Sequence, residues 1–534
     1  MPAPTKRNNN SIGVIDIFAG PGGLGEGFSS FVPQPSSRRR PFKLAVSAEM
    51  EKSAHETLRL RSFFRSLQQY EGEMPVPYAS YLADVAAGRA CSPGEQFGAG
   101  RWREFWSEAD KEALNLTMGE QEHNRRLHER IKEVQSNFNQ LILIGGPPCQ
   151  AYSVVGRARQ RHVKGFRTKG DHRHFLYRQY LEILSTFAPD VFIMENVKGI
   201  LTSRVGGNHM FSAIVEDLSN PSRALGISTR EPLERREYVL LPVHIEEGTE
   251  RCAEKAAINP SSFIIRCEKH GVPQARHRVI IMGVRTDHAH KAVSAQALES
   301  CDRQISIKDA LAGLPKLRSG ISYEKDDVRR WIRTVEEQRR LVISSAGKGA
   351  QGIRDQLRSL NLDPSLSRTS NRYSESTSAY SVKLRHPQQK YVLNHETRGH
   401  MASDLGRYLF CSAFGLAQGR SPNSSEFPGM LSPDHANWGT GAFSDRFRVQ
   451  LREKPSSTVT SHLSKDGHAF IHWDPAQCRS LTVREAARLQ SFPDDYLFLG
   501  NRTQQFVQVG NAVPPLIAQQ IARVVWSILE PEEA

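Results

Sequence analysis

Five short apolar runs, each ending where a loop begins, constrain the fold of this 534-residue chain most strongly. They cover residues 12–18, 42–48, 141–144, 191–194 and 279–284, and helix-like stretches such as 175–187 lie between them. Short β-branched runs that alternate with helices are typical of a mostly parallel, doubly wound sheet. The sequence therefore predicts the α/β fold class.

The alternation of strands and helices stops after about residue 286. Residues 340–380 are rich in Ser, Arg and Gly, which indicates loops or an irregular module, and helical patterns return at 481–489 and 515–529. A chain of this length usually exceeds one hydrophobic core. We expect one domain made of residues 1–285 and 476–534, and a second, smaller domain at 286–475. The polar, charged stretch 86–135 is predicted to be an insertion within the first domain.

The formal net charge of +14 favours a polyanionic partner. Between residues 329 and 420 there are 16 Lys and Arg against 7 Asp and Glu, so most of the surplus lies in the second domain. Contacts of such residues with phosphates would make binding salt-dependent. The seven cysteines never form a CxxC pair, which argues against a disulfide framework or a zinc site, and we expect no metal.

A glycine-rich loop, DIFAGPGGLG at 16–25, follows the first run. Glycines at such a place let a ligand approach the backbone at the start of a helix. Gly20, Gly22 and Gly25 satisfy the GxGxxG spacing of dinucleotide sites, so a dinucleotide, S-adenosylmethionine and a plain structural turn all remain open for this loop. Glu49 ends the second run and could bind ribose hydroxyls in the first two cases.

Three polar groups occur at the ends of later runs. Cys149 follows two prolines, which restrict the backbone and present the thiol in one direction. Glu195 ends the next run, 46 residues later. A buried thiol and a helix-capping carboxylate are the structural alternatives, but strand ends of one sheet edge favour joint chemistry. Arg276 and Arg278 precede the last run and suit phosphate or carbonyl binding, or surface ion pairs.

Together these blocks resemble the cytosine-5 DNA methyltransferase family. The blocks occur in order as DIFAGPGGLGEGF at 16–28, GGPPCQ at 145–150, ENV at 195–197, QARHR at 274–278, RSLTVREAARLQSFP at 479–493 and GNAVPP at 510–515. Only 86–135 and 286–475 fall outside the resemblance. The family's third block is placed at Asp84, which leaves an unusually long gap before Cys149.

The resemblance implies a Rossmann-like methyltransferase fold, a mixed sheet with an inserted target-recognition domain, and a last helix that packs beside the glycine loop. It implies methyl transfer from S-adenosylmethionine to carbon 5 of a cytosine flipped out of the duplex, through a bond between Cys149 and carbon 6. Glu195 would hydrogen-bond N3 and the exocyclic amine, Arg278 would hold O2, and Arg276 would support the site or bind a phosphate. The implied cofactor contacts are Phe18, Ala19, Gly20, Gly22, Gly23, Leu24, Glu49, Asp84, Pro147, Leu176, Asn511 and Val513.

Two other functions compete with this one. The tRNA-methylating branch of the family is compact, whereas the 190 residues of 286–475 form a separate basic segment here, which favours DNA. A catalytically silent DNA-binding protein would be expected to lack Cys149 or Glu195. We therefore expect a monomeric DNA (cytosine-5-)-methyltransferase of the bacterial cytoplasm and nucleoid. Its partners would be double-stranded DNA and a restriction or phage-defence system, and no membrane.

Overall fold

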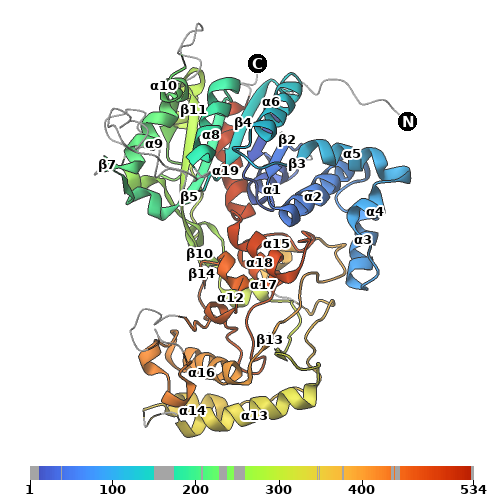
Figure 1. The fold of residues 1–534 in the computed structure, drawn as a ribbon, viewed down its shortest axis with the longest axis vertical. Helices are drawn as coiled ribbons and strands as arrows, with labels where there is room; N and C mark the ends of the chain where they lie inside the picture. The colour runs from blue at the N-terminus through green and yellow to red at the C-terminus, as the bar shows by residue number, and fades with distance from the viewer. Residues whose placement is uncertain are drawn as a thin grey trace.

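A computed structural model describes residues 11–37, 39–148, 174–205, 208–227, 237–245, 259–345, 347, 349–375, 378–434, 438 and 446–530. Cys149, the predicted nucleophile, lies outside these residues. The described part of the chain is built around one eight-stranded mixed sheet, with α13 and its neighbouring helices at the opposite end of the molecule (Figure 1). This architecture confirms the predicted fold class.

The main sheet has the strand order β3-β2-β1-β4-β5-β11-β8, and β9 also pairs with β11. Strands β1 to β5 run parallel, whereas β11 is antiparallel to β5, β8 and β9. Their bounds are β1 Ile12–Ile17, β2 Phe42–Glu49, β3 Ala113–Asn115, β4 Gln140–Gly145, β5 Val191–Val197, β8 Tyr238–Leu241, β9 Ile264–Arg266 and β11 His277–Arg285.

Both faces of this sheet are covered, which explains why its strands are continuously apolar. Val14 and Ile15, neighbours on β1, belong to different cores because successive side chains of a strand point to opposite faces. One face packs on α1 and α19 and the other on α6 and α8. The helices that flank the sheet are α1 Gly23–Ser30, α2 Lys52–Glu71, α6 Gln121–Gln135, α8 His174–Phe187, α9 Met210–Ser219, α10 Pro221–Leu225, α11 Ala289–Ser294 and α19 Pro515–Leu529.

Part of the stretch 86–135 belongs to the main sheet and its covering helices, and part lies outside the sheet. It supplies strand β3, which pairs with β2, and helix α6, which covers one face. The helices α3 Val76–Ala86, α4 Pro93–Phe97 and α5 Arg103–Glu112 instead pack on α2, where Phe63 contacts Phe97 and Trp106. The part that lies outside the sheet therefore ends near residue 112.

The second half of the chain contains two further cores. One joins the helices α13 Val328–Ser345, α14 Gln351–Arg358 and α16 Ala402–Gln418. The other joins α12 Ile307–Leu311 and α15 Ala379–Leu384 with α17 Val483–Leu489 and α18 Arg502–Asn511. Because this core contains residues from both sides of position 476, the predicted boundary there stays a prediction.

Three short strand pairs lie outside the main sheet. β10 Gln274–Ala275 pairs with β14 Ser456–Ser457, β12 Gly320–Ile321 with β13 Gly399–His400, and β6 Arg204–Val205 with β7 Asn208–His209. Among the described residues, one helical stretch, Arg502–Leu529, is long and apolar enough to cross a membrane. Its apolar window is 72% buried inside the protein, as expected of core helices.

Candidate active site

The predicted site residues converge at one edge of the sheet. Strands β1, β2, β4 and β5 are parallel, so their carboxyl ends lie at the same edge. Phe18, Glu49 and Gly146 stand at or directly after these ends, and Glu195 lies two residues before the last residue of β5. Ligands of open α/β sheets bind at this edge.

Glu195 and Arg278 form an ion pair there. The Nε atom of Arg278 lies 2.8 Å from Oε1 of Glu195, and the two side chains are only 16% and 14% exposed. Antiparallel pairing of β5 with β11 brings them together, because Ile280 is the direct partner of Glu195 and Arg278 lies two residues further along the same face.

The carboxylate of Glu195 also lies against the block that leads to Cys149. A Cβ on Gly146 would stand 3.0 Å from Oε2 of Glu195, so a larger residue at 146 would press on the carboxylate. Asn196 fixes the same block, since its buried amide donates to the carbonyl of Pro147 at 2.9 Å. Asn196 was not among the predicted site residues, although its place after Glu195 near a strand end was a usable signal.

Arg276 has a different setting from Arg278. It is 2% exposed, and its guanidinium donates to the carbonyls of Val459 at 2.8 Å and Gly510 at 3.3 Å. Burial, and then the neighbouring charge of Arg278, lower the pKa of Arg276 to about 10. A side chain so enclosed suits the support of the site and not a contact with a DNA phosphate.

A second buried side chain, Gln274, joins the same blocks and was missed by sequence reasoning. Its amide nitrogen donates to the carbonyl of Leu489 and to Oε1 of Gln490, and its oxygen accepts from the N–H of Val459. Gln490 in turn donates to the carbonyl of Val509. These contacts tie the block before β11 to the two closing blocks of the chain.

A hydrogen bond connects the glycine loop to Glu49. The N–H of Gly20 donates to Oε2 of Glu49, and the N–H of Glu51 to Oε1, each at 2.8 Å. Burial raises the pKa of Glu49, and these backbone donors oppose the rise. Phe18 adopts φ +56°, an unusual conformation for a bulky residue. Its partly buried ring packs on the same apolar cluster as Leu114 and Leu176.

The closing block returns to this loop, as the resemblance implied. A Cβ on Gly23 would collide with the carbonyl of Val513, and the hydroxyl of Tyr496 donates to the carbonyl of Pro21. Asn511 is exposed at the end of α18, and Val513 is buried. Beneath the loop lies Asp16, whose carboxylate is completely buried; burial raises its pKa to about 8.

Comparison with known proteins identifies the family of the chain. A family model described as C-5 cytosine-specific DNA methylase matches residues 104–221 and 259–527. The chain belongs to this family. It is therefore a DNA (cytosine-5-)-methyltransferase, as the order of its sequence blocks predicted.

Several curated relatives of the methyltransferase match over most of their length. The Type II methyltransferase M.Bpa9945I of Bacillus paralicheniformis is 31% identical over 527 residues, which cover 97% of this chain and 99% of that protein. The Type II methyltransferase M.AgeI of Thalassovita gelatinovora is 26% identical, covering 72% and 82%. The DNA (cytosine-5-)-methyltransferase M.ApeKI of Aeropyrum pernix is 26% identical, covering 73% and 81%.

Asp84 of the methyltransferase does not join the other predicted cofactor residues. It lies on α3, outside the sheet, where its 41% exposed side chain pairs with Arg89 at 3.0 Å. The strand that pairs with β2 on its other side is β3, and β3 ends at Asn115. The amide of Asn115 donates to the carbonyls of Glu49 at 2.9 Å and Met50 at 3.1 Å. Asn115 therefore lies beside Glu49, which holds the glycine loop.

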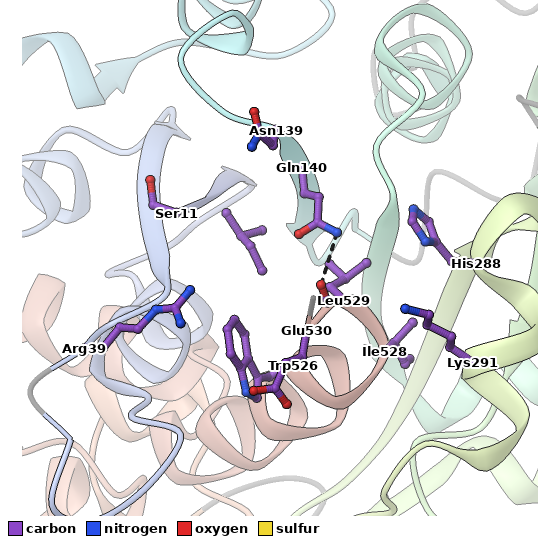
Figure 2. Close-up of a pocket in the computed structure, with 11 residues that line it drawn as sticks. Ser11, Arg39, Asn139, Gln140, His288, Lys291, Trp526, Ile528, Leu529 and Glu530 are labelled. Atoms are coloured by element: carbon purple, nitrogen blue, oxygen red, sulfur yellow. Dashed lines mark hydrogen bonds between the residues drawn. The ribbon is translucent and has the colours of Figure 1, made fainter. Parts of the chain in front are cut away.

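A hollow of about 260 Å³ lies at the opposite edge of the methyltransferase sheet (Figure 2). Ile12 and Gln140, at the starts of β1 and β4, line it together with Trp526, and the Gln140 amide donates to the carbonyl of Leu529. None of the predicted site residues that the structure describes lines this hollow. It is therefore separate from the candidate active site.

Proposed function

We propose that this methyltransferase acts through a covalent bond between Cys149 and carbon 6 of a cytosine flipped out of duplex DNA. The observation that carries the proposal is the Glu195–Arg278 pair, which lies against Gly146, three residues before Cys149. An acid and a cation side by side at the sheet edge suit two neighbouring atoms on the polar edge of a cytosine ring, N3 and O2.

The chemistry assigns one task to each side chain. Carbon 5 of cytosine is a weak nucleophile, and addition of the Cys149 thiolate to carbon 6 makes it an enamine-like one. After carbon 5 has taken the methyl group, a base removes its proton and the bond between carbon 6 and sulfur breaks, which releases the thiolate. Glu195 hydrogen-bonds N3 and the exocyclic amine and shares a proton there. Arg278 faces O2, where negative charge develops, and Arg276 holds the main chain around both. The base must leave the stack because these groups cannot reach it inside a duplex.

The cysteines that the structure describes fit the role of nucleophile poorly. Cys267, Cys411 and Cys478 are buried, and burial raises the pKa of each thiol, for Cys267 to about 12. The thiolate is the reactive form, so these three are poor nucleophiles. Cys91 and Cys301 are exposed. Neither stands at a carboxyl end of the main sheet's strands.

The glycine loop fits S-adenosylmethionine, which supplies an electrophilic methyl group when bound. The observations that support this fit are the tight packing of Gly23 on Val513, the carboxylate of Glu49 beside Gly20, and the partly exposed ring of Phe18. We assign Phe18 to the adenine, Glu49 to the ribose hydroxyls and Asn115, in place of Asp84, to the adenine edge. The remaining residues of the cradle are Ala19, Gly20, Gly22, Gly23, Leu24, Pro147, Leu176, Asn511 and Val513.

The biological setting follows from the relatives. M.Bpa9945I and M.AgeI carry the name Type II methyltransferase, and we propose that this enzyme likewise accompanies a restriction endonuclease in a bacterial cytoplasm. Residues 286–475 would choose the target sequence. The excess of positive charge between residues 329 and 420 suits a duplex partner.

Expression in a bacterial host without DNA methylation tests the function. Base-resolution mapping of 5-methylcytosine in host DNA should show one short target sequence methylated throughout the genome, and no signal with C149A. Mapping of host tRNA from the same cells is the second readout. Methylated tRNA with unmethylated DNA would favour the RNA alternative and contradict the proposal.

A further inference from the structure

One aromatic residue outside the active site combines a fully exposed side chain with an unusual backbone conformation. Tyr323 is fully exposed, at 103% of its reference accessibility, and its backbone adopts φ +65°. Its neighbour Glu324 donates its N–H to the carbonyl of Ile321, so Tyr323 is the third residue of a turn. Glycine or asparagine normally takes a turn position with positive φ, and a bulky residue there is strained.

The turn around Tyr323 is anchored on both sides. Before it, the N–H of Ser322 donates to the carbonyl of His400 at 3.0 Å. After it, Asp326 accepts two hydrogen bonds, at 2.9 and 2.8 Å, from Arg318, whose side chain is buried. Glu324 also pairs with Arg330 at 3.2 Å. The structure thus holds the turn rigidly although the ring itself packs against nothing.

The same turn is connected to the active-site blocks. It follows β12, which pairs with β13, and Figure 1 shows β13 between α17 and α18 on one side and α13 and α16 on the other. Arg398, next to β13, donates to the carbonyls of Leu463 at 2.9 Å and Lys465 at 2.8 Å. That segment continues from Val459, whose carbonyl accepts from Arg276.

Cations follow the ring closely in sequence. Lys325 is exposed two residues later, and Arg329 and Arg333 are exposed one helical turn apart at the start of α13. The carboxylates between them are already engaged, since Glu324 pairs with Arg330 and Asp326 with Arg318. An accessible aromatic ring with unpaired cations close to it in the sequence is a combination found on surfaces that bind nucleic acids. Strain of this kind persists only where the surrounding structure holds it, and it is more frequent at functional sites than elsewhere.

We propose that Tyr323 is a DNA-contacting residue of the methyltransferase. Its ring packs against a base of the bound DNA, and Arg329 and Arg333 bind neighbouring phosphates. This assignment rests on the proposed function, because it takes the duplex substrate as given.

Replacement of Tyr323 by glycine distinguishes the effect of the ring on DNA binding from the effect of the backbone strain on stability. Y323G removes the ring and relieves the positive φ, so its Tm should not fall and should rise by roughly 1–3 °C. Its affinity for the target duplex and its kcat/KM should fall by roughly 5- to 100-fold, the range of one base–aromatic stack. Y323F keeps the ring and should stay within about twofold of the wild type in both.

A matched control comes from Ala188, which also has a positive φ, of 43°, but lies between α8 and β5. A188G should equal the wild type in DNA binding. Y323N, which tolerates the backbone conformation, repeats the test if Y323G folds poorly. Wild-type binding and kcat/KM in either Tyr323 variant would overturn the assignment. A wild-type enzyme that methylates no DNA would instead contradict the proposed function, and this shows before any variant is made.

Discussion

Arg278 and Glu195 face each other across two antiparallel strands, with 2.8 Å between the guanidinium Nε and the carboxylate Oε1. Both are largely shielded from water, so each holds the other in place and loss of one leaves the other without compensation. The pair lies against Gly146, at the start of the block that carries Cys149. The position of the acid in the proposed mechanism depends on this arrangement.

Glu195 is therefore the first residue to test. E195Q keeps the size of the side chain but cannot provide the same proton, and kcat should fall by roughly two to four powers of ten. The matched control is E182Q, which alters a carboxylate on α8 that pairs with Arg178. Single-turnover methylation of a target duplex measures both. Nearly full activity of E195Q would make Glu195 a structural residue only.

Asp16 predicts a particular dependence of stability on pH. Burial raises its pKa in the folded protein to about 8, from a usual value near 3.8, with opposing contributions from the Gly25 backbone and Arg65. The folded state therefore binds the extra proton, and the stability that Asp16 contributes is full below pH 3.8 and is lost as pH rises through 8. D16N cannot ionise, so its Tm should decline less than that of the wild type between pH 6 and pH 9. Identical Tm profiles would contradict this prediction.

The pair Arg479–Glu485 predicts the opposite dependence of stability on pH. Both side chains are almost completely buried, at 1% and 2% exposure, and Arg479 donates two hydrogen bonds to the carboxylate. Although burial opposes it, the charge of Arg479 lowers the pKa of Glu485. The stability it contributes is present above pH 4.5 and is lost as pH falls below that value. E485Q should lower the free energy of unfolding by about 3–5 kcal/mol at pH 7, measured by urea denaturation.

Residues 286–475 should carry the choice of target. A chimera that takes this segment from a relative with another target should methylate the relative's sequence, since the catalytic blocks are common to enzymes with different targets. An active chimera that keeps the original pattern would locate recognition elsewhere, with α3 to α5 as the next candidate. Base-resolution mapping of 5-methylcytosine reads either result directly.

Phosphate contacts should behave differently from base contacts. The double variant R329Q/R333Q should weaken binding to all duplexes alike, and the slope of log affinity against log salt should fall by about two, one for each lost contact. R125Q, on the exposed face of α6, is the control for loss of a surface arginine, because Arg125 pairs with Glu122 and Glu129. Fluorescence anisotropy over a range of salt concentrations measures these slopes.

The sheet could be predicted from sequence because its strands are buried on both faces and therefore read as continuous apolar runs. Strand β3 could not, since its three residues, Ala-Leu-Asn, make no such run, and the third cofactor contact was therefore placed at Asp84 on α3. The burial of Arg276 depends on Val459 and Gly510, which are distant in sequence. Such long-range packing leaves no local pattern to detect.

The covalent bond between Cys149 and the target base is the central claim, and a duplex with 5-fluorocytosine at the target tests it most directly. Fluorine cannot leave carbon 5 as a proton does, so after methyl transfer the elimination step is blocked and a stable protein–DNA adduct should accumulate. Peptide mass spectrometry should locate this adduct at Cys149 in the wild type, and C149A should form none. An adduct at another cysteine, or no adduct from an enzyme that methylates the normal duplex, would contradict the account.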